Sequence, residues 1–384
     1  MAAKETSMDI QGFCDPRFES VRQAFLANFD GGNEVGASVA VTLDGVPVVD
    51  LWAGDADSNG RPWQEDTIVN VYSTTKTMAG TCMLMLADRG SLEFDAPVAT
   101  YWPEFAANGK QGVLVKHVMS HSAGLSGFDP PLETADDLYD WDAIVSRLAA
   151  QAPWWSPGEG SGYHAVTQGF LQGEIVRRVT GKSIGTFFRE EVAEPLGADF
   201  HIGLDPAHDG RVGELIPPGS GPNSAQGDPD SIGVRTMTSC PITGKEPRTS
   251  AWRRAEIPAA GGQGNARSVA RVHSALACGG EVDGVRLLSE AGVARALEEQ
   301  TQGKDRVLGV PIRFGMGFGL VGPTFPLSPN PRTFFWGGWG GSLAVIDLDA
   351  RMSVAYVMNK MAANIMGDVR GGSIVLSAYK ALEA

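Results

Sequence analysis

The stretch best suited to carry chemistry is Ser73-Thr74-Thr75-Lys76, at the point where a strand-like segment gives way to a helical one. A serine at the start of a helix has its hydroxyl and backbone N–H at the positive end of the helix dipole. Three residues is about one helical turn, so Lys76 lies on the same face as Ser73. A serine hydroxyl is a weak nucleophile until a neighbour takes its proton. A partly desolvated Lys76, or a base whose pKa Lys76 lowers, could do so.

The spacing alone is weak support, because roughly one S-x-x-K is expected by chance in such a chain. A second copy, Ser377-Ala378-Tyr379-Lys380, falls inside a C-terminal amphipathic helix and is interpreted as surface. The alternative for Ser73 is an ordinary N-cap residue.

A second candidate is Tyr163, in the segment Gly162-Tyr163-His164-Ala165 between the turn-rich WWSPGEGS and a helix. A loop position suits a residue that reaches into a cleft. Tyrosine acts as a base only where a cation stabilises its phenolate, because its free pKa is about 10. Lys76 could be that cation. The alternative is a half-buried tyrosine with a satisfied hydroxyl.

A third candidate is the run Trp336-Gly337-Gly338-Trp339-Gly340-Gly341-Ser342, which follows the strand-like TFF. Glycines at a strand edge allow a backbone to approach a ligand closely. A backbone N–H from this run could form half of an oxyanion hole, with the N–H of Ser73 as the other half. The alternative is a glycine-rich turn with aromatic cover.

Two other patterns are interpreted as structural. Gly181-Lys182-Ser183-Ile184-Gly185 matches G-x-S-x-G, but that motif requires a strand before it. The preceding GEIVRRVT is helical, so Ser183 is predicted to be an N-cap. His117 and His121 are four residues apart without an HExxH pattern, so we expect no metal site and a structural role for His121.

The elements that must position these residues follow from periodicity. Apolar positions in 17–29 predict a helix, 35–54 predict a hairpin around Asp44-Gly45, and a helix with an apolar stripe follows Ser73 up to Gly90. Further segments are helices at 167–181, 183–197 and 371–383, a Pro/Gly/Asp-rich stretch at 203–248, a strand at 314–322, and a hairpin at 342–359 around Asp349-Ala350. Strands towards both ends with helices between them favour one antiparallel sheet interrupted by a mostly helical insertion.

The amino-acid composition limits the classes of protein that this chain can belong to. The chain has 384 residues, 43% of them hydrophobic, and a formal net charge of −14. A packed core is feasible, while binding to a phosphate backbone is disfavoured. No repeat of 20–50 residues is present, and the longest apolar run, near 78–87, is too short to span a bilayer.

The first residues carry Lys4, Glu5 and Asp9 with no apolar stretch behind them, so no signal peptide is expected. The four cysteines form no CxxC pair, which favours reduced thiols in a cytoplasmic protein.

Taken in order, these motifs resemble the serine β-lactamase-like superfamily, and most closely the family VIII carboxylesterases related to class C β-lactamases. The resemblance is carried by STTK (73–76), HVMSHSAGL (117–125), SGYHAVTQG (161–169), GGQGNARSVARVHSAL (261–276) and WGGWGGS (336–342). It implies an α/β fold of the α+β type: a β-lactamase/transpeptidase-like antiparallel sheet flanked by helices. A second, mostly helical domain of residues 86–249 would be inserted between 1–85 and 250–384.

The resemblance also implies roles. Ser73 would be the acyl-forming nucleophile, Tyr163 the general base with Lys76 close to both hydroxyls, and the N–H groups of Ser73 and Trp339 the oxyanion hole. Class C β-lactamases carry Lys-Thr-Gly where this chain has Trp336-Gly337-Gly338, and Tyr-x-Asn where it has Tyr163-His164-Ala165. The cation and the amide that would bind an anionic β-lactam are therefore missing.

The expected function is a serine carboxylesterase for small to medium acyl esters, with weak or no β-lactam hydrolysis and no metal or cofactor. Aromatic walls suit neutral acyl or alcohol groups. The expected substrate pocket consists of Tyr72, Trp154, Trp155, Trp336, Gly337 and Gly338. The alternatives are an acyltransferase, an amide hydrolase, a β-lactamase or penicillin-binding-like enzyme, and an inactive binding or filament-forming relative. The partner would be a small ester, with neither nucleic acid nor membrane, and the oligomeric state stays open.

Overall fold

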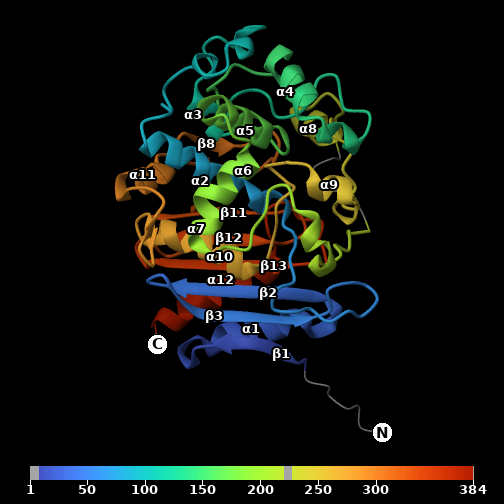
Figure 1. The fold of residues 1–384 in the computed structure, drawn as a ribbon, viewed down its shortest axis with the longest axis vertical. Helices are drawn as coiled ribbons and strands as arrows, with labels where there is room; N and C mark the ends of the chain where they lie inside the picture. Colours follow the sequence, from blue (N-terminus) through green and yellow to red (C-terminus); the bar gives the residue numbers. More distant parts are fainter. Residues whose placement is uncertain (1–7, 220–226, 384) are drawn as a thin grey trace.

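A nine-stranded antiparallel sheet forms the centre of the protein (Figure 1). The computed structural model describes residues 8–219 and 227–383. The strand order is β1-β3-β2-β13-β12-β11-β10-β9-β8. The strands are β1 (Ile10–Cys14), β2 (Gly36–Leu43), β3 (Val46–Gly54), β8 (Thr301–Lys304), β9 (Pro311–Phe314), β10 (Gly319–Leu320), β11 (Thr333–Gly337), β12 (Leu343–Asp347) and β13 (Met352–Met358). Strands β2 and β13 pair directly, so the two ends of the chain build one sheet, as predicted.

Both predicted hairpins are present. Asp44 and Gly45 link β2 to β3 with φ values of 50° and 81°, a left-handed turn that glycine adopts without strain. Strands β12 and β13 pair around Asp349-Ala350. The strand predicted at 314–322 is interrupted: β9 ends at Phe314 and β10 begins at Gly319, with Gly317 at φ 90° in the turn between them.

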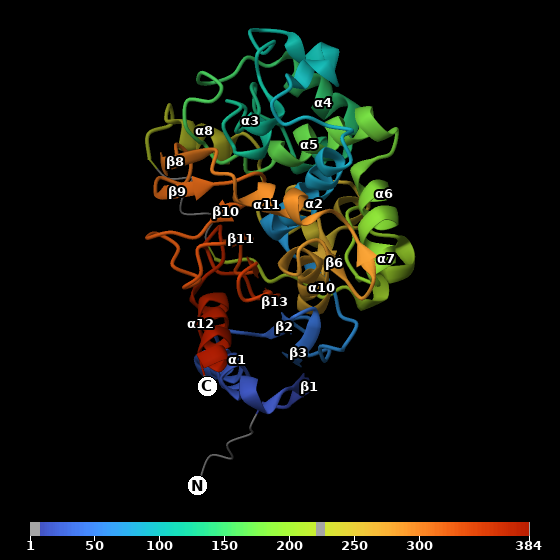
Figure 2. The same ribbon diagram turned by 90° about the vertical axis from the view of Figure 1, so that its left-hand side faces the viewer.

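Helices cover both faces of the sheet, which explains why β2 and β13 are buried along nearly their whole length. Helices α1 (Glu19–Phe29) and α12 (Val369–Glu383) lie together on one side, and α10 (Ala266–Ala277) lies on the other (Figure 2). The predicted fold class, an antiparallel sheet flanked by helices with a helical region, is confirmed.

Helix α2 (Thr75–Asp88) carries the candidate catalytic lysine and is more buried than predicted. Its residues from Thr75 to Leu86 are all buried, not only an apolar stripe. Its threonines fit this environment because they bond back to the helix: Thr77 donates to Thr74 O at 2.7 Å, and Thr81 donates to Thr77 O at 2.8 Å.

The helical region gathers at the end of the molecule opposite β1 (Figure 1). Helices α3 (Val115–Met119), α4 (Trp141–Ala150), α5 (Thr167–Thr180) and α8 (Ile232–Thr238) lie at that end (Figure 1). Helices α6 (Ile184–Phe188), α9 (Ser250–Arg254) and α11 (Glu290–Ala294) lie nearer the sheet, and α7 (Glu194–Leu196) lies at the level of the sheet (Figure 1). Two-stranded pairs join β4 (Val69–Asn70) to β5 (Gln263–Gly264) and β6 (Glu281–Val282) to β7 (Val285–Arg286). The domain limits 1–85, 86–249 and 250–384 stay a prediction.

Two sequence predictions concern the chain ends and the membrane. Within 8–219 and 227–383, no helix combines the length and the apolar character needed to cross a bilayer. The prediction about Lys4 and Glu5 lies outside the described residues, as does part of the Pro/Gly/Asp-rich stretch, 220–226.

Candidate active site

Ser73 sits in a single turn of 3-10 helix, Tyr72–Thr74, directly before α2. Two hydrogen bonds of the Thr75 hydroxyl hold this turn in place. Thr75 Oγ1 donates to Tyr72 O at 2.5 Å and accepts from Gly262 N at 2.9 Å. Tyr72 itself has φ 44°, a left-handed conformation that is uncommon for a bulky residue. The backbone is therefore constrained at the residue before the candidate nucleophile.

Three candidate residues converge on one oxygen atom. The Tyr163 hydroxyl donates to Ser73 Oγ at 2.7 Å, and Lys76 Nζ lies 3.3 Å from the same oxygen. Ser73 retains 8% of its surface exposed, whereas Lys76 and Tyr163 are each 2% exposed. Ser73 is thus the most accessible of the three.

The charged form of the Lys76 side chain is disfavoured in this buried position. Burial lowers its pKa well below the usual 10.5. Its Nζ also donates to Ala165 O at 2.6 Å and to Ala259 O at 3.0 Å. A neutral amine has two N–H groups, which these two carbonyls occupy, and one lone pair, which is then free to accept the proton of Ser73.

The pKa of Tyr163 is shifted in the opposite direction. Burial raises it above the usual 10.0, although the hydrogen bond with Ser73 and one from Trp336 Nε1, 3.4 Å away, oppose the rise. A neutral lysine with a neutral tyrosine holds as many protons as an ammonium with a phenolate, so the two groups titrate as a pair. The shifts favour the neutral pair, in which Lys76 accepts a proton and Tyr163 donates one.

Two buried groups hold the loop that carries Tyr163. Asp305 Oδ1 accepts the backbone N–H of Tyr163 at 3.0 Å. His121 Nδ1 accepts the N–H of His164 at 3.0 Å, and its ring centroid lies 5.0 Å from that of Tyr163. Burial lowers the pKa of both histidines, that of His164 to about 3, so they stay neutral hydrogen-bonding groups. This agrees with the structural role predicted for His121.

The glycine-rich run comes from the end of β11 and packs against the Ser73 turn. A Cβ at Gly338 would lie 2.2 Å from Val71 O and 3.2 Å from Ser73 N, so only glycine fits there. Ser342 Oγ contacts Thr74 Oγ1 and Val71 O, both at 2.9 Å, and joins the two segments. No hydrogen-bond acceptor is found for the N–H of Ser73 or of Trp339 among the described residues. Both donors are thus free to bind an oxyanion.

A cavity opens at Ser73. Its wall is mostly apolar. The described lining residues are Tyr72, Ser73, Tyr163, Ala165, Val166, Thr236, Met237, Cys240, Ile242, Ala260, Trp339 and Ile365.

The pocket predicted from the sequence needs correction, because only Tyr72 of its six members lines this cavity. Trp336 is 1% exposed and packs behind Tyr163, with ring centroids 5.3 Å apart. Gly337 and Gly338 contribute backbone that supports the turn, not cavity wall.

Trp154 and Trp155 face other partners. Trp154 Nε1 donates to Asp129 at 3.3 Å, and Arg235 lies over its ring. The ring of Trp155 packs on His164, at a centroid distance of 5.8 Å. The aromatic surface near Ser73 is instead supplied by Tyr72 and Trp339, whose ring centroids are 5.1 Å apart.

Sequence reasoning missed most of the cavity wall. Met237, Cys240 and Ile242 belong to the end of α8 and the loop after it, and Ile365 belongs to a loop before α12. None of these segments has apolar periodicity, so no sequence signal identified them. Asp305 was missed for the same reason, since it lies in the turn between β8 and β9.

The other patterns behave as structural features. Ser183 is the N-cap of α6, accepting from Thr186 N at 3.2 Å. His117 Nδ1 accepts from Leu114 N, so its ring is used within its own turn. Among residues 8–219 and 227–383, no group of three His, Cys, Asp or Glu side chains is arranged to hold a metal ion.

Comparison with known proteins places this geometry in a family. The Beta-lactamase family profile matches residues 22–377. The esterase/beta-lactamase LipL of Mycobacterium tuberculosis (strain ATCC 25618 / H37Rv) is 40% identical over 378 residues, which is 92% of this chain and 84% of that protein.

Two solved structures have the same fold. A family VIII carboxylesterase is 46% identical, with a TM-score of 0.91 over 97% of this chain and 100% of that one. A penicillin-binding protein homologue from Caulobacter crescentus is 42% identical, with a TM-score of 0.92 and the same coverage. The chain therefore belongs to the Beta-lactamase family, as a serine hydrolase of its esterase/β-lactamase group.

Proposed function

We propose that this protein is a carboxylesterase that hydrolyses neutral esters with small to medium acyl groups through an acyl-enzyme on Ser73. The observation that carries the proposal is the cavity at Ser73: none of its described lining residues is Asp, Glu, Lys, Arg or His. A neutral ester brings no charge into such a site. A penicillin must bury its carboxylate there without a partner, which costs free energy.

The proposed reaction begins with attack of Ser73 Oγ on the ester carbonyl while neutral Lys76 takes the serine proton. The N–H groups of Ser73 and Trp339 stabilise the oxyanion. The alcohol leaves with the proton of Tyr163, and Lys76 returns a proton to Tyr163. Water then cleaves the acyl-enzyme by the same steps in reverse. Here Tyr163 acts first as acid and then as base, whereas the sequence interpretation had it as the base throughout.

The test compares kcat/KM for p-nitrophenyl butyrate, the matched butyryl anilide and benzylpenicillin. The proposal expects the ester value to exceed both others by orders of magnitude. The charge-assisted hydrogen bond that a cation would give the penicillin carboxylate is worth about 1.5–3 kcal/mol, and no described residue lining the cavity is a Lys, Arg or His that could supply it. A benzylpenicillin value equal to the ester value would support the β-lactamase alternative, and an equal anilide value the amide hydrolase alternative.

A further inference from the structure

The N–H of Trp339 can bind an oxyanion only if its peptide plane is held in one orientation. In a planar trans peptide the C=O of Gly338 points opposite to the N–H of Trp339. Gly338 O accepts from Gly341 N at 3.2 Å and from Gly367 N at 3.3 Å. These two donors therefore determine where the Trp339 N–H points.

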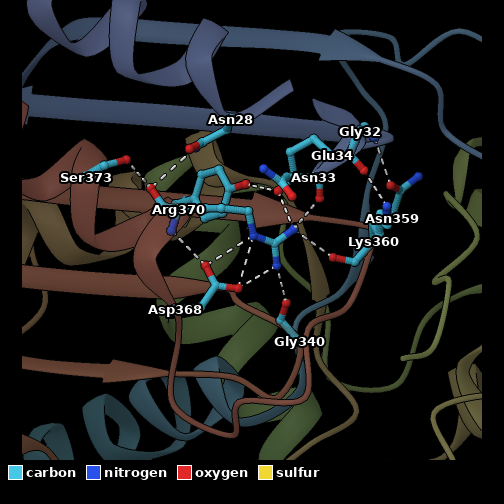
Figure 3. A network of polar contacts seen from close by, with 12 residues as sticks. Asn28, Gly32, Asn33, Glu34, Gly340, Asn359, Lys360, Asp368, Arg370 and Ser373 are labelled. Atoms are coloured by element: carbon cyan, nitrogen blue, oxygen red, sulfur yellow. Dashed lines mark hydrogen bonds and ion pairs between the residues drawn. The ribbon is translucent and has the colours of Figure 1, made fainter. Parts of the chain in front are cut away.

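Both donors belong to segments that meet at one buried side chain, Arg370 of α12 (Figure 3). Its Nη2 donates to Gly340 O at 2.6 Å, directly before Gly341. The same nitrogen donates to Asp368 Oδ2 at 2.6 Å, directly after Gly367. One guanidinium thus contacts both backbone segments, around Gly341 and Gly367, that hold Gly338 O.

The opposite edge of the guanidinium is equally occupied. Its Nη1 donates to Asn33 O at 3.2 Å, Lys360 O at 2.9 Å and Glu34 Oε1 at 2.5 Å. The side chain is 8% exposed and lines no part of the cavity at Ser73. The planar guanidinium offers five N–H groups in fixed directions, with Nε also donating to Asp368, whereas a lysine ammonium offers three.

Gly341 is adapted to this contact. A Cβ there would lie 2.6 Å from Arg370 Nη2 and 2.7 Å from Asp368 Oδ2, and its φ is 132°. The missing side chain lets the loop and the guanidinium approach each other.

We propose that Arg370 is a positioning residue for catalysis: it acts through Gly340 and Asp368 to orient the Trp339 N–H towards the oxyanion. This rests on the proposed acyl chemistry at Ser73. The simpler interpretation is that Arg370 only links α12 to the segment before β2, which would affect stability and not the reaction.

The experiment uses Arg370→Lys and Asp368→Asn, with Ser373→Ala as the matched control. The hydroxyl of Ser373 donates to the backbone O of Arg370 at 2.8 Å and makes no hydrogen bond to the guanidinium. Asp368→Asn weakens a second contact of the guanidinium and leaves Gly338, Gly341 and Gly367 unchanged, so it decides the question if Arg370→Lys fails to fold. Active sites are first counted with a fluorophosphonate, and kcat is expressed per labelled site.

The proposal expects kcat per labelled site to fall roughly 10- to 100-fold in both variants with KM nearly unchanged, a smaller loss than removing an oxyanion donor outright. The Ki of an alkyl boronic acid, whose serine adduct is tetrahedral and anionic, should rise in proportion. Ser373→Ala should match the wild type. Unchanged kcat per labelled site, or a fall in kcat with an unchanged boronic acid Ki, would overturn the proposal. Failure of the proposed function is distinct, because the wild type itself would then be labelled without hydrolysing the ester, or would not be labelled at all.

Discussion

Tyr163 and Ser73 meet through their hydroxyl oxygens, 2.7 Å apart, although 90 residues separate them in the chain. Lys76 Nζ also lies within 3.3 Å of this serine oxygen and is anchored by two backbone carbonyls. The serine therefore lies between a group suited to accept its proton and a group suited to donate one.

Replacement of the nucleophile should remove activity without removing the fold. Ser73→Ala deletes one hydroxyl and should lower kcat for p-nitrophenyl butyrate by roughly four or more orders of magnitude. Ser183→Ala serves as control: it should cost about 0.5–2 kcal/mol of stability through the lost N-cap and leave kcat unchanged. The opposite pattern, with activity lost only in Ser183→Ala, would contradict the assignment.

Tyr163→Phe separates the two possible roles of the tyrosine. If Tyr163 protonates the departing alcohol, the variant should be strongly impaired towards ethyl butyrate. Measured as kcat/KM, which reports acylation alone, the loss should be much smaller with p-nitrophenyl butyrate, because a nitrophenolate leaves without a proton. Equal losses of kcat/KM on both esters would mean that Tyr163 takes the serine proton instead. Lys76→Ala should be severely impaired on both, and the double variant should lose far less than the sum of the two effects.

The pH profile should reflect the lowered pKa of Lys76. The amine is active when deprotonated, so kcat/KM should rise with pH through that pKa and be lost as pH falls. Because burial lowers this pKa, the rise should occur well below the usual 10.5. Tyr163→Phe measured with the nitrophenyl ester should still show the rise. A flat profile in stable protein would count against a titrating base.

Glu34 should make stability depend on pH. Burial raises its pKa from 4.5 to about 7, opposed by Arg370. Arg370 already pairs with Asp368, so Glu34 is the second carboxylate on one cation. The folded state then holds the proton more tightly than the unfolded state does. The stabilising contribution is present below pH 4.5 and is lost as pH rises through about 7.

The size of this contribution can be measured with Glu34→Gln, which keeps a neutral hydrogen-bonding side chain. Between pH 5 and pH 8, the free energy of unfolding of the wild type should fall by roughly 3 kcal/mol more than that of the variant. Denaturant titrations at both pH values provide the comparison. Parallel behaviour of the two proteins would show that Glu34 does not titrate in this range.

Much of this site could be predicted from the sequence because its parts lie at ends of regular elements. The Asp44-Gly45 turn, the helix after Ser73 and the glycines after β11 each have local signals, and their order matched a family. The cavity wall had no such signal: Met237, Cys240 and Ile365 are brought together only by tertiary packing. The burial of Arg370 could not be predicted either. An arginine on an amphipathic helix is usually exposed, and here its burial depends on segments far away in the chain.

The central claim is that Ser73 forms the acyl bond, and covalent trapping tests it most directly. The wild-type protein is incubated with a fluorophosphonate, its mass is measured intact, and the labelled peptide is sequenced. We predict one label per chain, on Ser73, with activity lost in the same proportion as the label appears. A label on Ser183 or on any other serine, with Ser73 unmodified in inactivated protein, would contradict the account.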